Sequence, residues 1–162
     1  MEYIQEIEGQ VGQLKNVSKE IRKKIRLGKL DEAYRLTAQY PNDLIIMSQR
    51  CTILIKQGRL EEAKIIGKQF EDDPIIQSQM VTIAIQEGDI ERANAIGAKF
   101  ESNEAIQSQM ITIAIQEGRL EDAKAIGEKF QDNPMIQNQM ITIAIQEGRL
   151  EEAKAIGGSL SC

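Results

Sequence analysis

Histidine and tryptophan are both absent from this chain of 162 residues. Without histidine there is no Ser-His or Cys-His nucleophile pair, and the commonest ligand of catalytic zinc is missing. The acidic residues recur at positions that helix capping and solvation explain. We therefore expect no enzyme, no catalytic residues, no metal site and no cofactor.

Cysteines and long apolar runs are also scarce. Cys51 occupies an apolar position of the sequence pattern, which predicts a buried thiol, and Cys162 would be a tail thiol able to oxidise between chains. No uncharged apolar run reaches the roughly 18 residues of a membrane-spanning helix. The opening residues, MEYIQEIEGQ, lack the basic and apolar regions of a secretory signal. We expect a cytoplasmic protein that does not enter membranes.

What the sequence has in abundance is internal repetition with a period of 30 residues. Hydrophobic residues make up 41% and charged residues 28%, which is the composition of a folded chain rather than a disordered one. A period in the range of 20 to 50 residues is typical of a solenoid. The near-identity of the units indicates recent duplication or consensus design. The aligned positions include Gly28, Gly58, Gly88, Gly118 and Gly148, and five residues after each of these, Ala33, Ala63, Ala93, Ala123 and Ala153.

Each unit has the pattern of two helices. Asp73, Asn103 and Asn133 are placed to cap the first helix, which ends at a glycine able to adopt a left-handed conformation. The second helix runs from about residue 120 to 130 in the fourth unit. There Ala123 and Gly127 leave a groove that lets a neighbouring helix approach closely. One such pair cannot bury its own apolar faces, so the units must stack.

These features predict an all-α fold, an α-solenoid of about five stacked helix-turn-helix repeats in a single domain of residues 1–162. An N-terminal capping helix precedes the repeats; a coiled-coil seam is the alternative for this segment, because its apolar residues follow a 3-4 spacing. The last repeat is not polar on its outer side, so we expect an exposed apolar end that meets another copy. The predicted boundaries are 1–13 for the cap and about 14–43, 44–73, 74–103, 104–133 and 134–162 for the repeats.

The first helix of each repeat is apolar over more than half of its circumference, so it should be packed on several sides. Gln77, Gln107 and Gln137 fall inside the apolar arc. We expect these glutamines to be largely buried and to form hydrogen bonds between repeats.

The remaining arc of the first helices carries short uncharged polar side chains at i, i+4 and i+8, edged by isoleucines. Stacking would bring these stripes into a ladder. A solvated face and a partner-binding surface both remain open, although a solvated face usually prefers Glu and Lys. The candidate partner-binding residues are Ser78, Thr82, Ile85 and Gln86; Ser108, Thr112, Ile115 and Gln116; and Asn138, Thr142, Ile145 and Gln146.

The turns GRLEEA (residues 58–63 and 148–153) and GDIERA (residues 88–93) resemble those of tetratricopeptide-like repeats. Met80 and Ala93 match packing positions of that family, and the resemblance covers about residues 14–157. The repeat here has 30 residues rather than 34, and the family's Trp and Tyr landmarks are missing. The resemblance implies a concave surface that binds a protein or peptide, formed by the candidate partner-binding residues named above.

The turn also resembles that of pentatricopeptide repeats, which read single-stranded RNA. That resemblance places base-reading residues at Ser78, Ser108 and Asn138, with partner positions at Asp73, Asn103 and Asn133. Between Pro74 and Gly157, however, 7 Lys and Arg stand against 13 Asp and Glu, a net charge of −6. Phosphate binding requires the opposite sign, which disfavours a nucleic-acid partner.

The function that we expect is therefore a non-catalytic protein-protein interaction scaffold that binds a peptide or helix. A self-assembling structural or designed repeat protein without a ligand is the first alternative. A single-stranded RNA binder of the pentatricopeptide type is the second.

Overall fold

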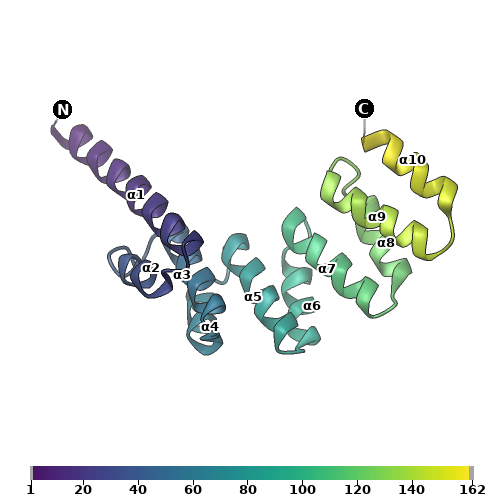
Figure 1. Ribbon diagram of the computed structural model, residues 1–162, viewed down its shortest axis with the longest axis horizontal. Helices are drawn as coiled ribbons and strands as arrows, with labels where there is room; N and C mark the ends of the chain where they lie inside the picture. The colour runs from purple at the N-terminus through teal and green to yellow at the C-terminus, as the bar shows by residue number, and fades with distance from the viewer. Residues whose placement is uncertain (1, 161–162) are drawn as a thin grey trace. The chain divides into compact units, whose positions relative to one another are not determined.

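The computed structural model describes residues 2–160, which form ten α-helices and no strand (Figure 1), so the predicted all-α class is confirmed. Cys162, the expected tail thiol, lies outside the described residues. None of the described helices combines the length and apolarity needed to span a bilayer. The helices are α1 (Glu2–Arg26), α2 (Leu30–Thr37), α3 (Leu44–Lys56), α4 (Leu60–Gln69), α5 (Pro74–Gln86), α6 (Ile90–Lys99), α7 (Glu104–Gln116), α8 (Leu120–Glu128), α9 (Pro134–Gln146) and α10 (Leu150–Leu160).

The helices alternate in the order that the repeat predicts. Each of the last four repeats contains one 13-residue helix followed by one of 9 to 11 residues. The amino-terminal part differs in one respect. The predicted cap and the first helix of the first repeat are one uninterrupted helix, α1, with no break near residue 13.

The chain divides into two compact units, Met1–Ile83 and Ala84–Cys162, with the boundary inside α5. In the first unit, α1 packs on α2 and α3, and α3 packs on α4. Its core includes Ile21, Ile46, Ile53 and Leu54, all fully buried or nearly so. In the second unit, α7 packs on α6, α8 and α9, and α9 packs on α10. Its core gathers Ile111, Ala114, Ala123, Ile136 and Ile143. Stacked helical hairpins therefore account for the packing within each unit.

The expected ends of the first helices are present in the last three repeats, whereas α8, expected to reach about residue 130, ends at Glu128. The side chains of Asp73, Asn103 and Asn133 each accept a hydrogen bond from the backbone N–H three residues later, at 2.8 to 3.0 Å. At the other end of α7, Gly118 has φ = 75° and its N–H bonds to the carbonyl of Ile115, while Arg119 N–H bonds to Ala114. This is the Schellman pattern, which satisfies carbonyls that lack partners inside the helix.

The glycine inside each second helix makes room for a methionine of the next repeat. A Cβ atom built on Gly67 would lie 2.7 Å from Met80 Cγ, and one on Gly97 would lie 2.7 Å from Met110 Cγ. Both distances are far below van der Waals contact. The close approach predicted from Ala123 and Gly127 is thus confirmed, and Met140 fills the groove at Gly127.

Two of the three inward glutamines are buried as expected. Gln77 and Gln107 are each 7% exposed, whereas Gln137 is half-buried. Gln107 Nε2 donates to Gly97 O at 2.9 Å and to Phe100 O at 3.0 Å. Gly97 is in the last turn of α6, where carbonyls have no partner within the helix. The glutamine of one repeat therefore caps the second helix of the preceding repeat.

Replacing Gln107 by methionine, which is similar in volume, should lower the free energy of unfolding by about 1–3 kcal/mol, because the buried Gly97 carbonyl loses its donor. Chemical unfolding followed by circular dichroism measures the change. Gln116→Met, on the exposed side of the same helix, is the matched control and should have almost no effect. Equal stability of the two variants would contradict the proposed capping role.

The last repeat is less covered than the repeat before it. Met140 and Ile141 are half-buried, whereas their equivalents Met110 and Ile111 are buried. Leu150 is 58% exposed. An apolar end is therefore present at this repeat, and its association with another copy remains a prediction.

Candidate partner-binding surface

The candidate residues differ widely in accessibility. Gln86, Thr112, Gln116, Asn138, Thr142, Ile145 and Gln146 are exposed; Ser78, Thr82, Ile85 and Ile115 are half-buried; Ser108 is buried. The hydroxyls of Thr82, Thr112 and Thr142 donate to the carbonyl four residues earlier in their own helices. That bond uses the hydroxyl proton of each threonine within its own helix, so the exposed Thr142 presents mainly its methyl group and an acceptor oxygen to a partner.

In the first unit, the stripes of neighbouring first helices are joined by Gln79. Its Nε2 donates to Ser48 O at 2.8 Å and to Thr52 Oγ1 at 2.7 Å. Ser48 and Thr52 are the equivalents, one repeat earlier, of Ser78 and Thr82. Equivalent polar residues of α3 and α5 therefore lie side by side, as a ladder requires.

The second unit repeats this arrangement. Gln139 Nε2 donates to Ser108 O and to Thr112 Oγ1, both at 3.0 Å, and Ser108 Oγ donates back to Gln139 Oε1 at 3.0 Å. Part of the ladder thus holds adjacent repeats together. Thr112 is used in this contact, so the candidate residues left for a partner are the other exposed ones: Gln86, Gln116, Asn138, Thr142, Ile145 and Gln146.

Apolar side chains line one edge of the stripe and are strongly exposed. In the first unit, Ile45 is 60% and Ile75 is 61% exposed; in the second, Met135 is 64% and Ile145 is 54% exposed. Ile45, Ile75 and Met135 occupy the same repeat position, which holds Ala105 in the fourth repeat. Exposed aliphatic groups beside uncharged polar groups suit a peptide-binding face.

Sequence reasoning did not find the role of Gln79 and Gln139. The helical projection places them beside the stripe, but their partners belong to another repeat. The available signal was the recurrence of glutamine at Gln49, Gln79, Gln109 and Gln139.

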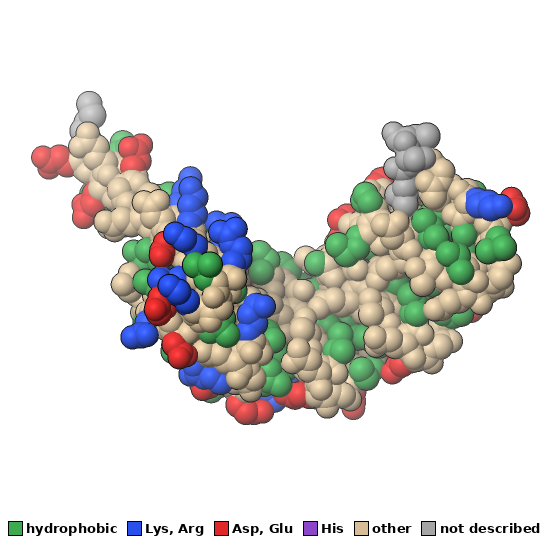
Figure 2. Space-filling model, in the orientation of Figure 1, with side chains coloured by type: hydrophobic (Ala, Val, Ile, Leu, Met, Phe, Trp, Pro, Cys, Tyr) green, Lys and Arg blue, Asp and Glu red, His purple; other side chains and the backbone are tan. Residues whose placement is uncertain are grey.

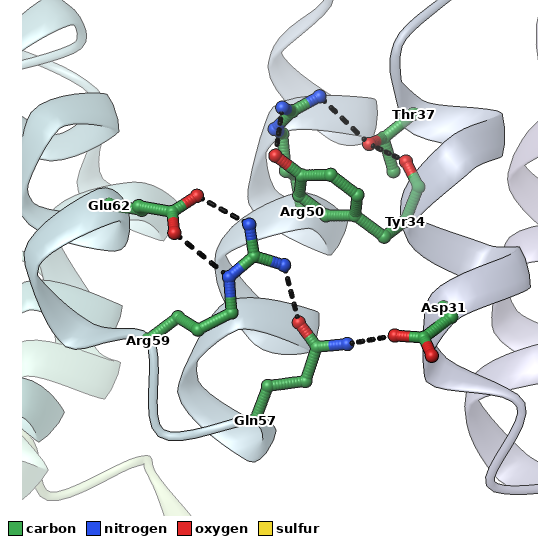
Figure 3. Close-up of polar contacts among 7 residues, drawn as sticks. All are labelled: Asp31, Tyr34, Thr37, Arg50, Gln57, Arg59 and Glu62. Atoms are coloured by element: carbon green, nitrogen blue, oxygen red, sulfur yellow. Dashed lines mark hydrogen bonds and ion pairs between the residues drawn. The ribbon is translucent and has the colours of Figure 1, made fainter.

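A polar cluster around Tyr34 is a second feature that the sequence did not reveal (Figure 3). The guanidinium carbons of Arg50 and Arg59 lie 4.2 and 4.5 Å from the centre of the Tyr34 ring, within the range of a cation–π contact. Arg50 also donates to Tyr34 Oη and to Thr37 Oγ1. Arg59 binds Glu62 through two hydrogen bonds, which lower the pKa of Glu62 and raise that of Arg59.

This cluster replaces the contact between glycine and methionine. Thr37 and Arg50 occupy the positions that Gly67 and Met80 hold one repeat later. Thr37 is fully buried, and the Arg50 guanidinium donates to its hydroxyl at 3.2 Å. This hydrogen bond joins the first repeat to the second at the position where later repeats are joined by apolar packing of methionine on glycine. The cluster therefore has a structural explanation.

A groove between α1 and α3 is lined by basic residues. Arg22 and Arg26 occupy the positions held by Thr52 and Lys56 one repeat later, so the stripe becomes basic on α1. Two adjoining pockets, of about 690 and 680 Å³, follow this groove and share Lys19, Arg22 and Gln49. Gln49 Nε2 donates to Ser18 O, while its buried Oε1 has no donor within the described part of the chain.

No protein-family model matches the chain, and comparison with curated proteins gives no match either. The structure itself defines the class of protein, an all-α chain whose consecutive helices pack as stacked hairpins within each compact unit.

Proposed function

We propose that this chain is a non-catalytic scaffold that binds a peptide or helix of another protein along the first-helix face. The observation that carries the proposal is the exposed, uncharged edge at Ile45 and Ile75 in the first unit and at Met135 and Ile145 in the second. A helix face that contacts only water usually carries charged residues such as Glu and Lys at these positions. The resemblance to tetratricopeptide-like repeats supports the same function.

A peptide is the ligand that this chemistry suits best. Thr142, Gln146 and Gln116 offer hydroxyl and amide groups that can pair with a peptide backbone, which has both donors and acceptors. The neighbouring aliphatic groups can bury the ligand's apolar side chains, and an amphipathic helix or extended segment presents both kinds of group. The net charge of −6 over residues 74–157 disfavours the RNA alternative.

The proposal predicts that lysines on this face weaken peptide binding. Peptides selected from a displayed random library on the wild-type chain should bind the Gln116→Lys/Thr142→Lys variant at least about tenfold more weakly, because an unpaired ammonium must be desolvated. Fluorescence anisotropy with the selected peptides measures the dissociation constants.

The matched control is Ala125→Lys/Ala155→Lys, which adds the same charge on exposed positions of the second helices. It should leave affinity unchanged. If no peptide is enriched, or if both variants bind as well as the wild type, the scaffold proposal fails. The alternative of a self-assembling structural protein without a ligand is then favoured, because the contacts of Gln139 and Met110 between adjacent repeats stabilise the stack without any partner.

A further inference from the structure

The first half of α1 carries an apolar stripe with no partner in the described residues. Tyr3 is 77%, Ile4 61%, Ile7 49% and Val11 46% exposed. Ile4, Ile7, Val11 and Leu14 follow the 3-4 spacing of a coiled-coil seam. The same stripe continues into Ser18 and Ile21, which are buried within the first unit. The first half of α1 projects past α2 and α3 (Figure 1), so its exposed apolar stripe continues beyond the part of the helix that is packed in the first unit.

The charge on α1 changes sign at the middle of the helix. Residues 2–13 of α1 contain three Glu and no Lys or Arg, whereas residues 14–26 contain six Lys and Arg and one Glu. Figure 2 shows this separation, with acidic groups near the free end of α1 and basic groups where the helix joins the rest of its unit. Parallel copies of such a helix would place like charges together, and antiparallel copies would place opposite charges together.

The groove beside the basic half of α1 suits an acidic, amphipathic helix. One of its two pockets, of about 680 Å³, is lined by Val11 and Leu14 from the apolar stripe and by Ile45 and Ile46 from α3. Lys15, Lys19 and Arg22 line the same pocket. An occupant therefore needs an apolar face and negative charge, and the first half of α1 has both.

We propose that two copies of this chain associate through antiparallel α1 helices, each placing its first half in the groove of the other. The pairing is isologous: one self-complementary surface supplies both sides of the interface, as two-fold symmetry requires. Val11 lies near the symmetry axis, and the exposed Ile4 and Ile7 of one copy become covered by the partner's Leu14 and Ile45. Ile45 also belongs to the apolar edge of the proposed peptide-binding face, so the dimer and a bound peptide share this residue. Gln116 and Thr142, which test peptide binding, are not part of the α1 interface.

Charge determines the direction of pairing. Glu8 and Lys15 are seven residues apart and lie on the same flank of the apolar stripe. Antiparallel pairing brings Glu8 toward the partner's Lys15, and the symmetry makes this contact twice. The opposed helix dipoles favour the same direction.

Analytical ultracentrifugation of the full chain, from about 1 to 200 µM, tests the association. The wild type should form a dimer. Ile7→Asp places a carboxylate in the stripe and should weaken the dimer by at least about tenfold. Gln13→Asp is the matched control, because Gln13 is exposed on the opposite side of α1, and it should not alter the dissociation constant.

A charge exchange tests the antiparallel direction. Glu8→Lys and Lys15→Glu should each raise the dissociation constant about 2- to 10-fold, since each repels or loses its partner at two symmetric sites. Both substitutions in one chain should restore dimerisation, because the pairs are regenerated with exchanged signs. Circular dichroism confirms that the single variants remain helical.

Three results would overturn the proposal: a wild-type monomer throughout the concentration range, a dimer that survives Ile7→Asp, or a double variant no better than the singles. The second result would place the interface elsewhere, with the exposed end of the last repeat as the next candidate. A monomer that binds an added acidic amphipathic peptide would assign the groove to another protein instead.

Discussion

In the folded protein, Cys51 should react with iodoacetamide at least about a thousandfold more slowly than in the urea-unfolded chain at about pH 8. Cys51 is fully buried, and burial raises the pKa of its thiol to about 12. The ordinary value is 9.0. A difference of about three pKa units reduces the reactive thiolate about a thousandfold, before any steric exclusion is counted.

Mass spectrometry of a Cys162→Ser chain measures this rate at a single thiol. A useful control moves the thiol to an exposed position, as Gln86→Cys in a chain lacking both native cysteines, and this thiol should react nearly as fast as in the unfolded chain. Fast labelling of Cys51 under native conditions would mean that α3 is not packed as described.

Replacing Gly97 by valine should lower the free energy of unfolding by about 2–3 kcal/mol, because the new side chain overlaps Met110. Gly12→Val is the matched control. Gly12 also lies inside a helix, but a Cβ there meets nothing within 4 Å. Since valine and glycine differ little in helix propensity, the control should change stability by only about 0.5 kcal/mol.

A second substitution identifies the cause of the loss. Met110→Ala alone should cost about 2–5 kcal/mol by creating a cavity. In a chain that also carries Gly97→Val, the valine partly fills the cavity. The loss of stability in the double variant should therefore be smaller than the sum of the two single losses by at least about 1 kcal/mol. Strict additivity would contradict direct contact between these residues.

Much of the fold was predictable because it depends on local rules applied at a fixed period. The side chain of Asn103 caps the start of α7, and backbone hydrogen bonds around Gly118 end it. Both features can be predicted by aligning the repeats of the chain with one another. The burial of Gln107 followed from its place inside an apolar arc. The groove at Gly127 followed from a glycine that costs helix stability unless another residue occupies the space.

What could not be predicted depends on the relation between helices. The bond from Gln139 to Ser108 requires the register of α9 against α7, which the projection of one helix does not contain. Thr37 and Arg50 both differ from the residues at the equivalent positions of the later repeats. Predicting the bond between them requires knowing that these two positions are in contact. The continuity of α1 was left open by Gly9 and Gly12, which weaken a helix without ending it.

Removal of one repeat is the most direct test of the claim that equivalent contacts join successive hairpins. Deleting residues 104–133 from the 162-residue chain joins Asn103 to Pro134, which recreates the native Asn133–Pro134 junction and brings Met140 to the groove of Gly97. We predict helical circular dichroism per residue close to that of the full chain, cooperative unfolding and a urea m-value lower by roughly a fifth. Deleting residues 104–118, which removes α7 alone, should instead disrupt the second unit. A 30-residue deletion that loses its helicity or its cooperative transition would contradict the account.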